Sequence, residues 1–135
     1  MEARRLRDVR RLALAGVVVL AACGDGATAP GRDPEIINST DNFQYQITAI
    51  QDFSGTQVYS WQNTGATATV NQAATVAAGS ATLVLRDANG VEVYNRSLAD
   101  NGTFSSSAGT AGSWTVRVVY SGADATVNFR VDKAN

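Results

Sequence analysis

Apolar and polar residues alternate with a period of two over most of the chain beyond residue 42. This period places successive side chains on opposite faces of a β-strand, so each alternating run predicts a strand with one buried face. The runs fall at residues 43–49, 59–62, 66–71, 81–86, 91–96, 114–120 and 125–131. The pattern therefore predicts β-structure throughout this part of the chain.

Turn-forming residues separate these runs. Asp87-Ala88-Asn89-Gly90 predicts a hairpin, because Asn-Gly accepts the positive φ that tight turns require. Asp100-Asn101-Gly102 and Ser121-Gly122-Ala123-Asp124 predict further turns. The alanine-rich residues 72–78 are ambiguous and allow a single helical turn. Seven or eight short strands at this spacing predict an all-β fold, an antiparallel β-sandwich, with a small closed barrel as the alternative.

The first 22 residues have the properties of a signal peptide. Five arginines precede an apolar run from Leu12 to Ala22, which is too short to span a bilayer and ends in small residues. We expect residues 1–22 to be removed, although a buried N-terminal helix is an alternative. The remaining chain has six basic and ten acidic residues, a net charge of about −4.

The apolar run ends in Leu20-Ala21-Ala22-Cys23, which contains the only cysteine of the chain. This sequence resembles the lipobox of bacterial lipoproteins, whereas an ordinary secretory leader would carry the cysteine by chance. The resemblance implies cleavage before Cys23 and attachment of lipid to its thiol, which would hold the protein on a membrane. In enteric bacteria, an aspartate directly after the cysteine resembles an inner-membrane retention signal. This chain has Gly24 at that position. We therefore expect the outer membrane or the cell surface.

Residues 24–34 contain three glycines, both prolines of the chain and almost no large apolar side chain. Such a segment buries too little surface to offset the entropy of ordering it. We therefore predict a lipidated flexible tether over residues 23–40. A single β-sandwich domain is predicted over residues 41–135.

Composition argues against several classes of function. A mildly acidic domain with scattered arginines has no basic patch for nucleic acid. The absence of histidine removes Ser-His catalysis and the commonest zinc ligand. The acidic residues lie mostly in turns or in the tether, and no two of them have the convergent spacing of a catalytic acid–base pair. We predict no enzymatic activity and no cofactor.

One segment has the oxygen ligands that calcium prefers. Asp87, Asn89 and Glu92 form a D-x-N-G-x-E pattern. It lacks the further acidic ligands and the twelve-residue frame of an EF-hand loop. The favoured interpretation is a hairpin turn in which the Asp and Asn side chains bond to their own backbone, with calcium as the alternative.

Two segments of the C-terminal half share a further resemblance. Residues 79–90 end in Asp87-Ala88-Asn89-Gly90, and residues 111–118 contain Gly112-Ser113-Trp114-Thr115-Val116. They are similar to the pre-peptidase C-terminal type of bacterial β-sandwich, in which an Asp-x-x-Gly hairpin precedes a Gly-x-Trp/Tyr-x-Val strand. The resemblance implies the sandwich fold and transfers no catalytic residue.

The aromatic residues allow two interpretations. Exposed rings stack on sugars, so Tyr59, Trp61, Tyr94 and Trp114 would suit a carbohydrate platform. Tyr59 and Trp61 share one strand face, however, and Trp114 shares its face with apolar residues, so these three are predicted in the core. Tyr94 alternates with the apolar positions and is predicted to be an exposed ligand contact.

Residues 53–85 contain no charged side chain. Charged groups are costly to desolvate in the core of an interface, so an uncharged surface suits a protein partner. An uncharged sheet edge also suits strand addition. We take Thr67 and Thr69 as the candidate partner surface. The sequence thus favours a membrane-anchored binding module for a protein partner, with a carbohydrate-binding lipoprotein as the alternative.

Overall fold

The computed structural model describes residues 33–134. These residues form an antiparallel sheet of seven strands and contain no helix, which confirms the predicted all-β fold. The strands are β1 (Glu35–Ser39), β2 (Asn42–Asn63), β3 (Ala68–Gln72), β4 (Thr75–Arg86), β5 (Glu92–Ser97), β6 (Gly102–Ser105) and β7 (Gly112–Lys133).

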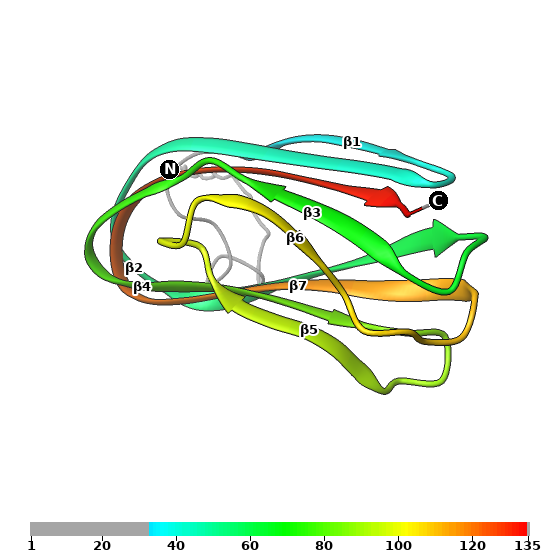
Figure 1. Cartoon of the computed structure of the whole chain (residues 1–135). Helices are drawn as coiled ribbons and strands as arrows, with labels where there is room; N and C mark the ends of the chain where they lie inside the picture. The colour runs from blue at the N-terminus through cyan, green and yellow to red at the C-terminus, as the bar shows by residue number, and fades with distance from the viewer. Residues whose placement is uncertain (1–32, 135) are drawn as a thin grey trace, which may run out of the picture.

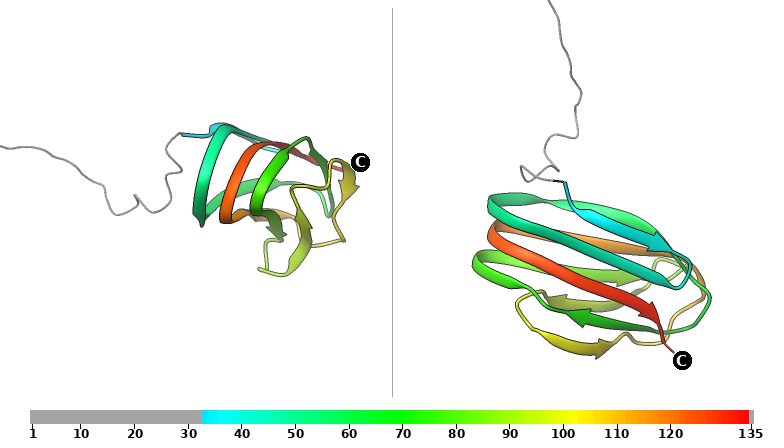
Figure 2. Two further views of the ribbon diagram at one scale, coloured as in Figure 1. Left: turned by 90° about the vertical axis from the view of Figure 1, so that its left-hand side faces the viewer. Right: turned by 90° about the horizontal axis from the view of Figure 1, so that it is seen from above.

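The sheet folds over on itself into two packed layers, because β2, β4 and β7 bend sharply (Figures 1 and 2). The first layer has the order β1, residues 42–47 of β2, residues 125–133 of β7, β3 and β6. The second layer has the order residues 55–63 of β2, residues 112–120 of β7, residues 80–86 of β4, and β5. The architecture is a sandwich in which long strands serve both layers.

Bulges and glycines produce the bend. The β2–β7 pairing shifts register at three places between Ile47 and Gly55, and the extra residues of a bulge bend a strand. Gly79 of β4 and Gly122 of β7 have φ angles of +68° and +52°. A β-carbon added at Gly79 would lie 2.1 Å from the carbonyl oxygen of Gly122. Only glycine therefore fits at position 79, where β4 approaches β7.

The bend corrects the predicted number and length of the strands. Residues 43–49 and 59–62 belong to the single strand β2, and residues 114–120 and 125–131 belong to β7. Ser121-Gly122-Ala123-Asp124 is a bend inside β7 and not a turn between two strands. Register shifts allow the strands to remain paired through the change of direction.

Two further boundaries differ from the sequence prediction. β1 lies within the predicted tether of residues 23–40, and it pairs with residues 42–46 of β2. The sheet therefore begins at Glu35, before the predicted boundary at residue 41. Residues 72–78 form no helical turn, because β3 ends at Gln72 and β4 begins at Thr75.

Aromatic and aliphatic side chains fill the space between the layers. Trp61 and Trp114 are 1% and 0% exposed, and their rings meet edge to face with centroids 6.0 Å apart. Phe129 stacks on Phe43 and on Tyr45. Large rings contribute much of the buried apolar area of a small domain. The predicted core position of both tryptophans is confirmed.

Candidate functional site

The predicted lipidation motif, Leu20, Ala21, Ala22 and Cys23, lies outside the described residues, so its processing stays a prediction. The first strand of the described residues is β1, an edge strand of the first layer. Within residues 33–134, no helix has the length and hydropathy needed to cross a membrane.

Tyr94 is buried, so its predicted role as an exposed ligand contact is wrong. It is 7% exposed, and its hydroxyl donates a hydrogen bond to Oε1 of Gln72 at 2.6 Å. The β4–β5 pairing shifts register between Leu85 and Arg86. Opposite this shift, Val93 and Tyr94 are both buried although they are adjacent in sequence. The bulge breaks the alternation from which exposure was predicted.

Thr67 and Thr69, the predicted partner surface, are half-buried. Thr69 lies in β3, which pairs with β6 on one side and with β7 on the other. The carbonyl of Thr67 accepts hydrogen bonds from the N–H of Ala134 and from the side chain of Asn63. Because β3 is paired on both sides, it is not a site for strand addition. Binding through the two side chains stays a prediction.

The segment that contains Asp87, Asn89 and Glu92 folds as a turn. The Asp87 carboxylate accepts hydrogen bonds from the N–H groups of Thr110, Val91 and Asn89, each at 2.9 Å. These bonds, that of Thr110 foremost, lower the pKa of Asp87. In the described part of the chain, no group of three or more acidic, histidine or cysteine side chains could hold a metal ion. The contacts therefore support the turn interpretation.

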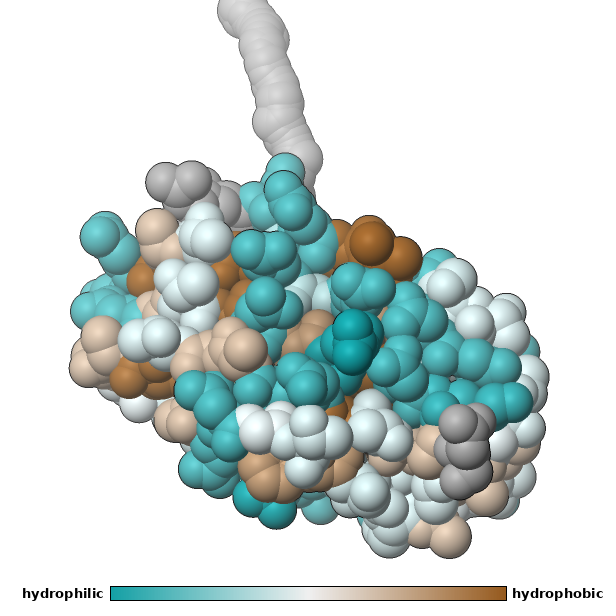
Figure 3. Space-filling view, turned by 45° about the horizontal axis from the view of Figure 1, so that its top comes forward, coloured by the Kyte–Doolittle hydropathy of each residue, from teal (hydrophilic) through white to brown (hydrophobic). Residues whose placement is uncertain are grey.

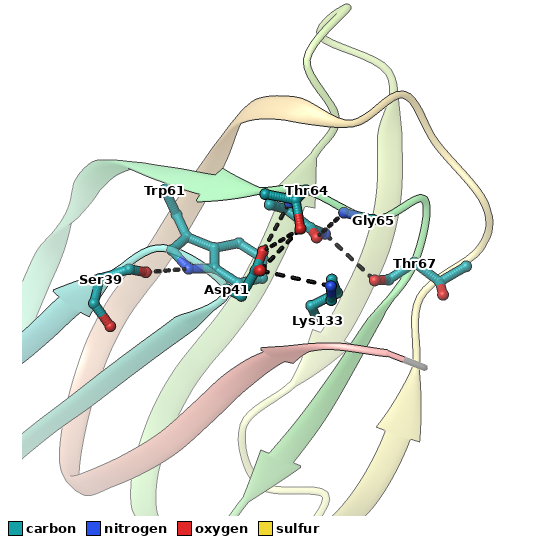
Figure 4. A network of polar contacts seen from close by, with 8 residues as sticks. Ser39, Asp41, Trp61, Thr64, Gly65, Thr67 and Lys133 are labelled. Carbon is teal, nitrogen blue, oxygen red and sulfur yellow. Dashed lines mark hydrogen bonds and ion pairs between the residues drawn. The ribbon is translucent and has the colours of Figure 1, made fainter.

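A polar network ties the two layers together at the end opposite the bend (Figure 4). The Asp41 carboxylate, in the β1–β2 turn, accepts the N–H and the hydroxyl of Thr64, each at 2.8 Å. Nζ of Lys133 lies 3.7 Å from the same carboxylate. Nε1 of Trp61 donates to the carbonyl of Ser39 at 3.1 Å. The N–H bond from Thr64 is the main cause that lowers the pKa of Asp41. These contacts indicate a structural role.

The second half of β2 is a free sheet edge on the β1 side of the sandwich (Figure 2). Residues 55–63 pair with β7 on one side and with no strand of the described chain on the other. Val58, in the middle of this edge, is 59% exposed. Proteins usually protect such edges with charge, proline or a bulge. Residues 55–63 contain none of these.

Within residues 33–134, the outward backbone groups of Thr56 and Val58 have no pairing partner on this edge. Two carbonyls of this edge accept hydrogen bonds from outside the β2–β7 ladder. The carbonyl of Ser60 accepts one from the Asn38 side chain at 2.8 Å, and that of Gln62 accepts one from the N–H of Asp41 at 2.8 Å. In an antiparallel ladder, the N–H and C=O of every second residue point the same way. The register is regular over residues 55–63, so the corresponding groups of Thr56 and Val58 also point away from β7.

β1 extends the first layer one strand beyond this edge. The first layer has five strands and the second has four. Ring contacts of Tyr59 with Phe43 and Tyr45, at 5.6 and 6.1 Å, show that the two halves of β2 face each other. β1 therefore lies opposite a strand position that no described residue fills. Ile36 of β1 and Tyr59, both partly buried, pack against the core on the two sides of that position.

A shallow hollow of about 290 Å³ lies where the edge meets the β1–β2 turn. Its lining includes Asn38, Ser60, Gln62 and Ser113, and no charged side chain. The surface seen with the β1 side tilted forward shows hydrophobic groups in small separate patches (Figure 3). No motif in the sequence singles out Val58. It lies in the uncharged run of residues 53–85, but that run does not distinguish an edge strand from a central strand.

No protein-family model and no curated protein matches the chain. Among solved structures, the capsular polysaccharide assembling protein CapF from Staphylococcus aureus is similar, with a TM-score of 0.30 and 12% sequence identity. The likeness covers 76% of this chain and 29% of that protein, so the chain spans less than a third of its length. A likeness this weak transfers neither residues nor activity.

Proposed function

We propose that the protein is a lipid-anchored, non-enzymatic envelope protein whose sandwich binds a protein partner. The free, uncharged edge of β2 carries this proposal. Exposed, unpaired N–H and C=O groups along a sheet edge are a template for another polypeptide. An exposed Val58 at the centre of the edge adds apolar surface for such a contact.

The basic leader and the resemblance to a lipobox support anchoring through a lipid on Cys23, at the outer membrane or the cell surface. Confinement to a membrane raises the local concentration of the sandwich near partners on the same surface. An interaction of modest intrinsic affinity then suffices for stable association. Anchor and edge are proposed to act together.

The buried aromatic residues weaken the alternative of carbohydrate binding. Tyr94, Trp61 and Trp114 are each less than a tenth exposed, so none offers a ring face for stacking on a sugar. Tyr59 is half-buried and packs against the core. A protein partner is therefore the proposal, and a glycan array with the sandwich domain would detect the alternative.

The test is isolation of the tagged, full-length protein from native membranes after reversible crosslinking. The wild type is expected to carry a partner, and Cys23→Ser is expected to leave the membrane fraction and lose it. Val58→Lys is expected to reduce recovery of the partner, whereas a loss with Thr67→Lys or Thr69→Lys would place the partner at β3 and the residue before it. A wild type that carries nothing beyond the untagged control contradicts the proposal.

A further inference from the structure

We infer that the second half of β2 accepts one extended segment of the partner, which adds as a strand beneath β1. This inference rests on the proposed function and names the site and the mode of binding. The segment pairs with the N–H and C=O groups of Thr56 and Val58. It completes the second layer to the same number of strands as the first.

The hydrogen bonds of the edge define where the added strand ends. The Asn38 side chain already occupies the carbonyl of Ser60 from the side of the free edge. The outward groups without a partner among the described residues are therefore those of Thr56 and Val58 and the N–H of Ser60. A strand rises about 3.3 Å per residue, so a segment of about five residues covers this stretch.

The surroundings of the empty position specify the side chains of the segment. Its inward side chains meet Ile36 and Tyr59, which are apolar and partly buried. Its outward side chains lie beside Thr56 and Val58 on an uncharged surface. A charged inward side chain would be desolvated without a partner. The segment is therefore uncharged and apolar at alternate positions.

The overhang of β1 excludes a symmetric dimer through this edge. Antiparallel pairing of two identical edges is generated by a two-fold axis perpendicular to the sheet. That axis would place β1 of the second copy where the first half of β2 already lies. The added strand must therefore belong to a segment that is not covered by another layer of its own protein. A tail or a linker of another protein meets this condition.

Two proline variants test the role of the backbone groups. Val58→Pro and Thr56→Pro each remove one outward N–H, and proline is tolerated on an edge strand where its N–H would face solvent. Val58→Thr keeps the N–H and the branched shape. We expect about tenfold less partner with either proline variant, from lost hydrogen bonds and distorted pairing, and wild-type recovery with Val58→Thr. Thermal unfolding of the two proline variants verifies that each still folds.

Amide hydrogen exchange of the full-length protein supplies a direct readout with a defined probe. The probe is a capped hexapeptide of alternating threonine and valine, used at its solubility limit. With valines facing inward, the threonines pair with β2. The peptide is expected to slow exchange at Thr56 and Val58, and its N-methylated-threonine counterpart is not.

Each other outcome overturns the strand site. These are unchanged exchange at Thr56 and Val58 with the peptide, slow exchange at both amides before any peptide is added, and a dimer that Val58→Pro dissociates. Slow exchange before any peptide is added would assign the position to the chain's own residues 24–32. A dimer that Val58→Pro dissociates would assign it to a second copy. A partner recovered equally with Val58→Pro contradicts the strand site but leaves the proposed function standing. Isolation without any partner contradicts the proposed function itself.

Discussion

The side-chain amide of Asn38 in β1 donates a hydrogen bond to the backbone carbonyl of Ser60 in β2 at 2.8 Å. This bond joins the overhanging strand of the first layer to the free edge of the second. The carbonyl of Ser60 is the next one after that of Val58 to point away from β7. Asn38 thus closes one end of the strand position that no described residue fills.

Replacement of Asn38 by alanine is expected to lengthen the strand site. The carbonyl of Ser60 becomes available, so the threonine–valine peptide should protect the Ser60 amide more strongly than in the wild type. Loss of an exposed hydrogen bond should lower the free energy of unfolding by about 1 kcal/mol or less. Urea unfolding and hydrogen exchange measure the two effects. Weaker protection of Val58 in Asn38→Ala would contradict this role.

Gly79→Ala tests the bend. Gly79 has a φ of +68°, and a β-carbon there would meet the backbone of Gly122 at 2.1 Å. We expect a loss of about 2–4 kcal/mol in the free energy of unfolding. Gly90→Ala is the matched control, because Gly90 also has a positive φ but no atom within 4 Å of the added carbon. It should cost about 1 kcal/mol. Equal losses in urea unfolding would contradict a close approach of β4 and β7.

Asp87→Asn tests the turn through its pH dependence. The backbone bonds from Thr110, Val91 and Asn89 lower the pKa of Asp87 below its ordinary value of 3.8. The charged form therefore stabilises the fold above this pH, and the contribution is lost as the pH falls through the lowered pKa. The asparagine side chain keeps one acceptor oxygen but loses the acceptor for Thr110. The variant should unfold at a lower temperature at neutral pH, with a smaller further decrease below pH 4 than the wild type. Parallel profiles of Tm against pH would contradict this.

Buried tyrosines make the sandwich sensitive to alkali. Burial raises the pKa of Tyr94 and of Tyr120 to about 12 from an ordinary value of 10.0. The hydroxyl of Tyr120 also lies 2.7 Å from that of Tyr45, whose pKa is raised by burial. The neutral phenols favour the fold fully below pH 10, and this stabilisation is lost as the pH rises toward 12 and beyond.

Tyr94→Phe should reduce this alkaline loss of stability. The variant loses the bond to Gln72, at a cost of about 1–2 kcal/mol at neutral pH because Oε1 of Gln72 loses its donor. Phenolate absorbance and unfolding followed between pH 9 and 12.5 measure both effects. Ionisation of all tyrosines near pH 10 in the folded protein would contradict the burial of Tyr94 and Tyr120.

Side-chain alternation predicted the core because burial of alternate residues is a local property of a strand. It placed Trp61 and Trp114 inside, where both lie. It failed at Tyr94, because the register shift between Leu85 and Arg86 depends on the pairing of two strands. The alternation of residues within one strand does not reveal such a register shift.

The bend and the free edge could not be predicted from the sequence, because both depend on how the strands pair. Gly122 suggested a change of direction, but whether the chain turns back or continues into a second layer depends on β2 and β4 alongside it. The absence of charge around Val58 was visible in the sequence. Its position at an edge follows only from the strand order, in which β1 pairs with the first half of β2 and leaves the second half free.

The most direct measurement is photo-crosslinking in cells from a photoreactive residue that replaces Val58 in the full-length protein. Asn71, exposed on β3 of the first layer, is the control position. We predict a discrete protein adduct from position 58 that is absent from position 71. The adduct should fall about tenfold when Thr56→Pro is added and disappear when Cys23→Ser is added. Equal adducts from both positions, or an adduct from position 58 that persists undiminished with Thr56→Pro, would contradict partner binding at the β2 edge.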